Sequence, residues 1–436
     1  MDGLTLSLIC LAAVLVLIAL RMPIGVALPV VSLVGFWYLK GTATALSVVR
    51  EAPYAFAANW DLSAIPMFVL MGSIVFASGI AGALFHSARL WLSGLPGGLA
   101  VAANIASAGF AAGCGSSMAS AAAMSRLAVP EMRKAGYQDG LATGVVASAG
   151  TIAALIPPSI LLVLYGIFAE TSIADLLIAG IIPGILTALA YTFMIIVRCS
   201  LQPDLAPKVD IDIENLRRER WRSLGQIWPL IVIIVAIIGG IYTGSITPTE
   251  AGAAGSLLAL VMAVLQRRID LKGFLGAVRE AMVTTAQIFF VGIGALMFTR
   301  LLSLSGASQM LSDMIAPLGL DPVLIILAIS VIYLILGMFL DPIGIMLITM
   351  PVFIPLIQAM DMNMIWFGVI VVKFIEIGML TPPLGFNVFV VKGVVGESIS
   401  LGTIFRGVGW FLVCDVVVVA LMIIFPELST FLPDLM

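Results

Sequence analysis

The feature that most constrains this chain is a series of apolar runs, each about 20 residues long, with few charges between them. Only 10% of the residues are charged, whereas soluble domains carry about 25%. A charged side chain at the centre of a bilayer costs about 2.5–3.5 kcal/mol on insertion scales, so a surface that faces lipid must contain few of them. The sequence therefore predicts an all-α polytopic membrane protein and excludes a soluble globule.

The chain repeats one plan twice. The tetrapeptide Val-Arg-Glu-Ala at 49–52 returns at 278–281, and the proline pair Pro157-Pro158 returns as Pro382-Pro383, about 225 residues further on. The longest polar segment separates the two copies. We predict a first repeat at 1–199, a cytoplasmic linker at 200–226 and a second repeat at 227–436.

One segment in each repeat has the wrong length for a simple span. The segment 97–130 is too long for one crossing and too short for two, and Gly-Cys-Gly-Ser-Ser interrupts it at 113–117. We predict a re-entrant hairpin there and a second one at 321–358. Complete spans of the first repeat are expected near 5–20, 22–40, 64–84, 139–168 and 175–199. Five crossings and one hairpin invert the second repeat relative to the first.

The positive charges give the orientation. With the N-terminus outside, Lys40, Arg50 and Arg300 lie outside and Lys373 lies within a span, while the rest of the 21 Lys and Arg fall on the cytoplasmic side. Both termini are then periplasmic. The stretches at 41–62 and 268–283 are expected to be arm helices that lie along opposite faces of the membrane.

The proline pairs interrupt two of the predicted spans, 139–168 and 365–393. Consecutive prolines remove two backbone donors and break the helix. Non-helical backbone at membrane depth is tolerated only where it is buried in protein or lines a cavity. One interpretation is a kink healed by neighbouring helices. The functional alternative is a discontinuous helix whose free carbonyls bind a cation and whose half-helix N-terminus faces an anion.

The hairpin tips allow two interpretations as well. Small residues there permit close helix packing, but together with the broken spans they offer hard oxygen ligands suited to sodium. The first predicted sodium site comprises Gly113, Gly115, Ser116, Ser117, Gly150, Thr151 and Pro157. The second comprises Gly337, Asp341, Gly344, Thr349, Gly378, Thr381 and Pro382. The predicted substrate-binding residues are Ser117, Ser159, Lys373, Gly385 and Asn387.

Three charged residues within the predicted membrane segments each have two possible roles. Lys373 and Glu376 lie three residues apart on one helix face, where they either neutralise each other or serve the substrate or a gate. Asp341 either binds a ligand or caps the half-helix that follows it. No arginine is expected in the cavity, so Lys373 is the only cation predicted near the substrate.

Several chemistries are not supported. The chain has no Walker A pattern, and its one histidine and four scattered cysteines suggest no zinc site or disulfide framework. We therefore do not expect an enzyme, and uptake would have to draw on an ion gradient. A passive anion channel and a regulatory membrane scaffold remain alternatives.

Five segments together resemble the DctM-like large membrane subunit of tripartite ATP-independent periplasmic (TRAP) transporters, in the ion transporter superfamily. They are CGSSMASAAAMSRLAVPEMRKAGY (114–137), GTIAALIPPSILLVLYG (150–166), ITPTEAG (246–252), GMFLDPIGIMLITMPVFIP (337–355) and IEIGMLTPPLGFNVFVVKG (375–393). The resemblance implies sodium-driven import of a small organic acid, such as a C4-dicarboxylate, by an elevator movement in a bacterial inner membrane.

The resemblance also implies partners. These are a separate small four-helix membrane subunit (DctQ-like) and a periplasmic solute-binding protein (DctP-like) that delivers the organic anion. The lipid bilayer surrounds the complex, and no nucleic acid is involved. A stand-alone sodium/anion symporter of the same superfamily is the alternative among transporters.

Overall fold

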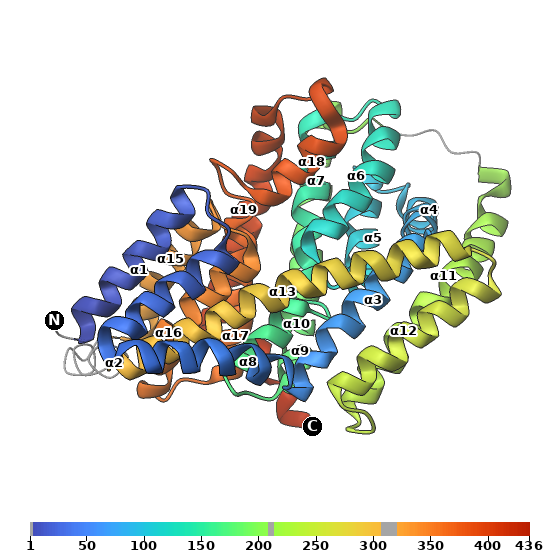
Figure 1. Ribbon diagram of the computed structural model, residues 1–436. Helices are drawn as coiled ribbons and strands as arrows, with labels where there is room; N and C mark the ends of the chain where they lie inside the picture. The colour runs from blue at the N-terminus through green and yellow to red at the C-terminus, as the bar shows by residue number, and fades with distance from the viewer. Residues whose placement is uncertain (1–2, 208–212, 307–320) are drawn as a thin grey trace.

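The structure is a computed structural model that describes residues 3–207, 213–306 and 321–436. In these three stretches every regular element is a helix, and eight helices are long and apolar enough to cross a membrane. The prediction of an all-α polytopic membrane protein is therefore confirmed. Figure 1 shows the helices and their order along the chain.

The helices of the first half are α1 (Gly3–Ala19), α2 (Ile24–Ala57), α3 (Ala64–Ala77), α4 (Ile80–Leu92), α5 (Gly98–Cys114), α6 (Ser117–Lys134), α7 (Asp139–Gly150), α8 (Ile160–Phe168), α9 (Ile173–Ala179) and α10 (Ile181–Leu201). Those of the second half are α11 (Ile213–Tyr242), α12 (Pro248–Leu265), α13 (Leu271–Ser305), α15 (Pro322–Gly337), α16 (Pro342–Ala359), α17 (Met364–Gly378), α18 (Phe386–Val395), α19 (Leu401–Ile424) and α20 (Glu427–Thr430). Short 3₁₀ turns lie at Trp60–Ser63, Thr151–Ala154, Pro203–Leu205, Gly396–Ser398 and Pro433–Leu435.

The two predicted arm helices differ in the structure. In α2 the backbone leaves the helical region at Gly41 (φ 82°, ψ 179°), which separates the predicted span from the predicted arm. The corresponding stretch at 268–283 has no such break, because α13 continues through it as one helix of 35 residues. At 1.5 Å per residue this helix is about 50 Å long, and in Figure 1 it crosses most of the molecule.

The predicted linker at 200–226 includes the start of a helix. Residues 208–212 lie outside the described residues, and α11 begins at Ile213, so the polar stretch after it is helical. One arginine there, Arg220, has partners on α4. Arg220 Nε donates to the carbonyl of Leu90 at 2.8 Å, and its guanidinium lies 5.6 Å from the centre of the Trp91 ring. Contact with protein thus accounts for Arg220, whereas Arg218 and Arg222 are exposed.

The helices pack as two groups. In the first, which we call the frame helices, α2 packs on α13, α13 on α3, α3 on α12, and α11 on α12, while α4 packs both on α11 and on α5 of the second group. In the second, the core helices, α7 packs on α5, α6, α18 and α19, while α17 packs on α8, α9, α15 and α16. Each half of one broken span thus contacts the opposite half of the other, since α7 meets α18 and α17 meets α8.

Small residues permit the close packing of the core helices. A Cβ atom added to Gly144 of α7 would lie 2.6 Å from the carbonyl carbon of Gly407 on α19, so the two backbones are in contact. Nearly every residue of α7 and α17 is buried. The centre of the molecule is therefore formed by the helices that lead into the proline pairs.

Candidate functional site

The first hairpin tip is a tight break between α5 and α6. Gly115 has left-handed backbone angles (φ 61°, ψ 12°), which glycine adopts without the penalty of a Cβ. Ser116 is extended, and its hydroxyl caps α6 by accepting from Ala119 N at 3.4 Å. A Cβ on Gly115 would collide with the carbonyl oxygen of Pro158. The tip therefore lies against the break in the first broken span.

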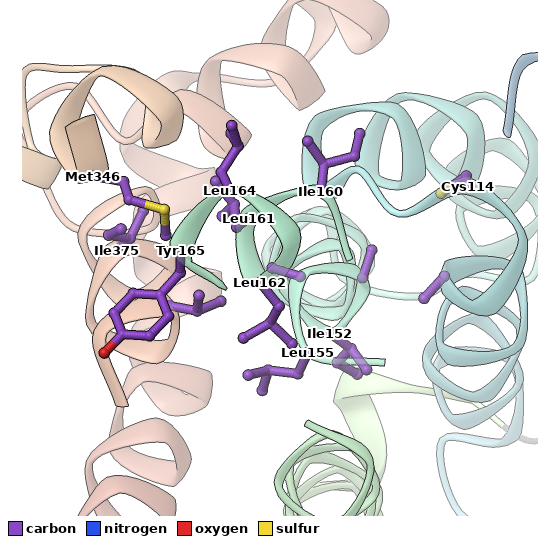
Figure 2. Close-up of a cluster of buried hydrophobic side chains, with 14 of the residues drawn as sticks. Cys114, Ile152, Leu155, Ile160, Leu161, Leu162, Leu164, Tyr165, Met346 and Ile375 are labelled. Carbon is purple, nitrogen blue, oxygen red and sulfur yellow. The ribbon is translucent and has the colours of Figure 1, made fainter. Parts of the chain in front are cut away.

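That break runs from the end of α7 to the start of α8. It contains a 3₁₀ turn and the cis bond Pro157-Pro158, and the Ser159 hydroxyl caps α8 by accepting from Leu162 N at 3.2 Å. A Cβ on Gly150 would lie 2.9 Å from the carbonyl oxygen of Ser117. Figure 2 shows the residues of α8 between Cys114 on one side and Met346 and Ile375 on the other.

The second hairpin tip has a different design. Here α15 ends at Gly337, and Asp341 caps α16 by accepting from Gly344 N at 3.0 Å, with Pro342 as the first helical residue. A Cβ on Gly337 would lie 2.6 Å from the Cα of Gly378, so the tip touches the end of α17. The capping role considered for Asp341 is observed.

The second broken span has its break between α17 and α18. It contains the cis bond Pro382-Pro383, and Gly385 is left-handed (φ 61°) directly before α18. The hydroxyl of Thr381 donates to Ile377 O at 2.8 Å. Thr349 lies inside α16 rather than at the tip, where its hydroxyl lies 2.7 Å from that of Tyr333 and donates to Ile345 O at 2.8 Å.

A cavity of about 530 Å³ lies between the frame helices and the core helices. Four predicted site residues line it: Gly115, Ser116, Ser117 and Asp341. Residues from both hairpin tips thus reach one space. The other predicted residues do not line this cavity, and Gly113 faces Val75 and Leu230 of the frame helices instead.

The cavity contains charged residues that the sequence analysis placed elsewhere or missed. Arg126 of α6 and Glu280 of α13 both line it, so the expectation that no arginine reaches the cavity is wrong. The sequence contains a signal for Arg126. The lining residues Ala119, Ala122 and Arg126 follow the spacing i, i+3, i+7, which places them on one face of a helix.

Lys373 does not neutralise Glu376. Its ammonium group lies 2.6 Å from Asp415 Oδ1 and donates to the Thr187 hydroxyl at 3.1 Å. Tyr191 donates to the same carboxylate oxygen at 2.7 Å. Lys373 and Asp415 are each only 1% exposed, and neither lines the cavity. The predicted pairing fails because Lys373 is directed toward α10 and α19 instead of along its own helix.

The remaining predicted substrate residues are also buried. Asn387 is fully buried at the start of α18, and its amide donates to Ala147 O on α7 at 3.4 Å. Ser159 is fully buried as the cap of α8. Glu376, by contrast, lines the cavity, and its Oε1 accepts a hydrogen bond from the Ser117 hydroxyl at 2.6 Å. This bond joins the first hairpin tip to α17.

Comparison with known proteins agrees with this architecture. Residues 11–428 match the family described as "Tripartite ATP-independent periplasmic transporter, DctM component". The chain is 33% identical to the sialic acid TRAP transporter large permease protein SiaM of Vibrio cholerae, over 95% of both chains. It is 34% identical to the C4-dicarboxylate TRAP transporter large permease protein DctM of Pseudomonas aeruginosa, over 86% of this chain and 87% of that protein.

Among solved structures, the YdaH transporter of Alcanivorax borkumensis shares the fold. The TM-score is 0.61 at 14% identity, and the match covers 90% of each chain. Family and fold agree with a polytopic helical membrane protein. The chain belongs to the family of DctM components of tripartite ATP-independent periplasmic transporters.

Proposed function

We propose that this chain is the large membrane subunit of a sodium-coupled importer for a small organic acid. The observation that carries the proposal is the pairing of each hairpin tip with a broken span, with both tips reaching one cavity. Non-helical backbone at these breaks leaves carbonyl groups without intrahelical partners, and hard oxygen atoms of this kind suit an alkali cation. One sodium site at each tip follows from this arrangement.

The substrate site is proposed in the cavity. The N-termini of α6 and α16 reach it through Ser117 and Pro342, and helix N-termini favour anions. Arg126 lines the same cavity and forms no ion pair or hydrogen bond with the described residues, so its guanidinium is free to bind a carboxylate. It replaces Lys373 as the cation of the substrate site.

An elevator movement is the proposed mechanism. The cavity separates frame helices such as α3 and α13 from core helices such as α6, α8 and α17. A core group that carries both tips could slide along the long helix α13 while the frame remains fixed. A bound sodium ion would offset the charge of the anion during passage through the roughly 30 Å apolar layer.

Two partners complete the proposed transporter in a bacterial inner membrane. They are a small DctQ-like membrane subunit and a DctP-like periplasmic protein that delivers the substrate. The two relatives named above carry different acids, so the substrate here is proposed only as a carboxylate. Purified together with these partners in proteoliposomes, the chain should take up the acid under an inward sodium gradient. Equal uptake in sodium and in choline would refute the coupling.

The same assay separates the alternatives. A stand-alone symporter would take up the acid without the binding protein, and an anion channel would conduct it without a gradient. Ser116→Ala and Thr381→Ala should each raise the sodium concentration needed for half-maximal uptake, one at each site. The exposed Thr243→Ala, on the loop after α11, is a matched control that should leave it unchanged.

The orientation is tested by labelling. We propose that both termini are periplasmic, which places Lys40 outside and Arg268 inside. Cysteines introduced at these two positions should react with an impermeant reagent from opposite sides of the membrane. The reverse pattern would place the binding protein on the wrong face and contradict the proposed direction of transport.

A further inference from the structure

Three charged side chains are buried among the residues that the structure describes: Lys373, Glu376 and Asp415. Lys373 and Asp415 form an ion pair at 2.6 Å and neutralise each other. Glu376, one turn further along α17, is also only 1% exposed and forms no ion pair with any described residue. The described part of the membrane domain therefore contains one buried charge without a counter-charge.

The two oxygen atoms of Glu376 have different surroundings. Oε1 accepts the hydrogen bond from the Ser117 hydroxyl, whereas Oε2 is buried and has no hydrogen-bond partner. Ser117 is the first residue of α6, so the positive end of that helix partly offsets the carboxylate charge. An ionised carboxylate in a buried position is strongly unfavourable unless a cation or further donors complete its environment. The free oxygen marks a place for such a group.

The residues around this carboxylate identify the kind of group. Gly115 and Ser116 of the hairpin tip, Ala154 of the first break and Met379 of the second break line the same cavity as Glu376. Each belongs to, or lies beside, a stretch where the backbone is not α-helical. Carbonyl, hydroxyl and carboxylate oxygens are ligands for hard cations, and a single carboxylate matches a single positive charge.

We infer that Glu376 is a ligand of the sodium ion at the first hairpin tip, which it binds through its free Oε2. The inference rests on the proposed sodium coupling and adds a residue from the second half of the chain to a site otherwise built from the first half. The ion would lie between the tip and α17, so its binding would fix the first hairpin against the second broken span. Arg126, on the same cavity, is left to the substrate.

The test measures sodium binding without transport. The complex with its small subunit is purified, and its thermal unfolding is followed while sodium replaces potassium at constant ionic strength. Glu376→Gln keeps a carbonyl oxygen for the Ser117 hydroxyl and replaces the charged Oε2 by an uncharged NH2 group, which cannot bind a cation. We expect it to raise the sodium concentration for half-maximal stabilisation by about tenfold or more, the effect of losing a charged ligand. Glu397→Gln, a fully exposed carboxylate, is the matched control and should leave it unchanged.

The outcomes separate this inference from the proposed function. If sodium and potassium stabilise the unmodified complex equally, and uptake is also independent of sodium, sodium coupling itself fails. If the unmodified complex responds to sodium and Glu376→Gln responds at the same concentration, Glu376 is not a ligand. If Glu376→Gln does not fold, Glu376→Asp is measured instead. Its shorter side chain keeps the charge but moves it away from the tip. An unchanged sodium concentration for half-maximal stabilisation would overturn the inference.

Discussion

The two hairpin tips are built on one backbone plan but differ in their chemistry. At the first tip a left-handed glycine, Gly115, fits against the carbonyl of Pro158, and the nearest carboxylate, Glu376, comes from the other half of the chain. At the second tip the carboxylate belongs to the hairpin itself, since Asp341 caps α16. Both carboxylates line the same cavity.

This difference shows what the duplication retained. Both halves keep a tip that touches the break of a span, through the close approach of Gly115 to Pro158 and of Gly337 to Gly378. Ser116 and Asp341 occupy equivalent positions, since each caps the second helix of its hairpin, but one is a neutral hydroxyl and the other a carboxylate. The contact between tip and break is thus common to the two sites, whereas the left-handed glycine and the charge of the cap differ between them.

The largest effect on stability is expected at Lys373. Glu376 contacts the first tip, whereas Lys373 forms a buried ion pair with Asp415. Removing one partner of a buried ion pair costs about 3–5 kcal/mol, so Lys373→Met should lower the stability of the protein in detergent by that amount. The double variant with Asp415→Asn should recover part of the loss in a double-mutant cycle. A stable Lys373→Met protein with lost substrate affinity would instead assign Lys373 to the binding site.

The second prediction tests the fit of the first tip. Gly115→Ala introduces a left-handed alanine, which costs about 1–2 kcal/mol, and a clash with Pro158 that adds about 1–3 kcal/mol of overpacking. Gly79→Ala is the matched control, because Gly79 is also left-handed (φ 70°) but has no atom within 4 Å of the added Cβ. Thermal unfolding and uptake should both suffer more in Gly115→Ala. Equal losses would show that the tip and the break do not need to touch.

The third prediction tests the fit of the second tip. Gly378→Ala places a Cβ 2.7 Å from the Cα of Gly337, and overpacking of this kind costs about 1–3 kcal/mol. Gly393→Ala, where nothing lies within 4 Å, should be neutral or stabilising. The comparison of the tips requires a smaller loss here than at Gly115, since Gly378 is helical and has no left-handed penalty. A larger loss of stability in Gly378→Ala than in Gly115→Ala would show that the second tip has the tighter fit.

The smallest effect on stability is expected at Asp341. Asparagine caps helices about as well as aspartate, so Asp341→Asn should change the free energy of unfolding by less than about 0.5 kcal/mol. If its charge also serves the second sodium site, the sodium concentration for half-maximal uptake should rise while stability is retained. If the sodium concentration for half-maximal uptake does not change, Asp341 acts only as a helix cap. The carboxylates at the two tips would then have different roles.

The sequence alone determined the local breaks at the paired prolines. Two consecutive prolines remove two backbone donors, and the structure has non-helical backbone at both pairs and at both glycine-containing tips, whereas single prolines such as Pro130 and Pro351 lie inside helices. The apolar runs likewise determined that the chain crosses a membrane. These signals act within a few residues, so they can be read without knowledge of the packing.

Only the tertiary structure decided which side chains meet. Ser117 and Glu376 are separated by 259 residues in the chain, and the partner of Lys373 lies on α19 rather than one turn away on α17. The course of α13 is a further example, since the sequence predicts a separate arm at 268–283, whereas one helix of 35 residues packs on both α2 and α3. Contacts between distant residues depend on how helices cross, and the spacing of residues along one helix does not contain that information.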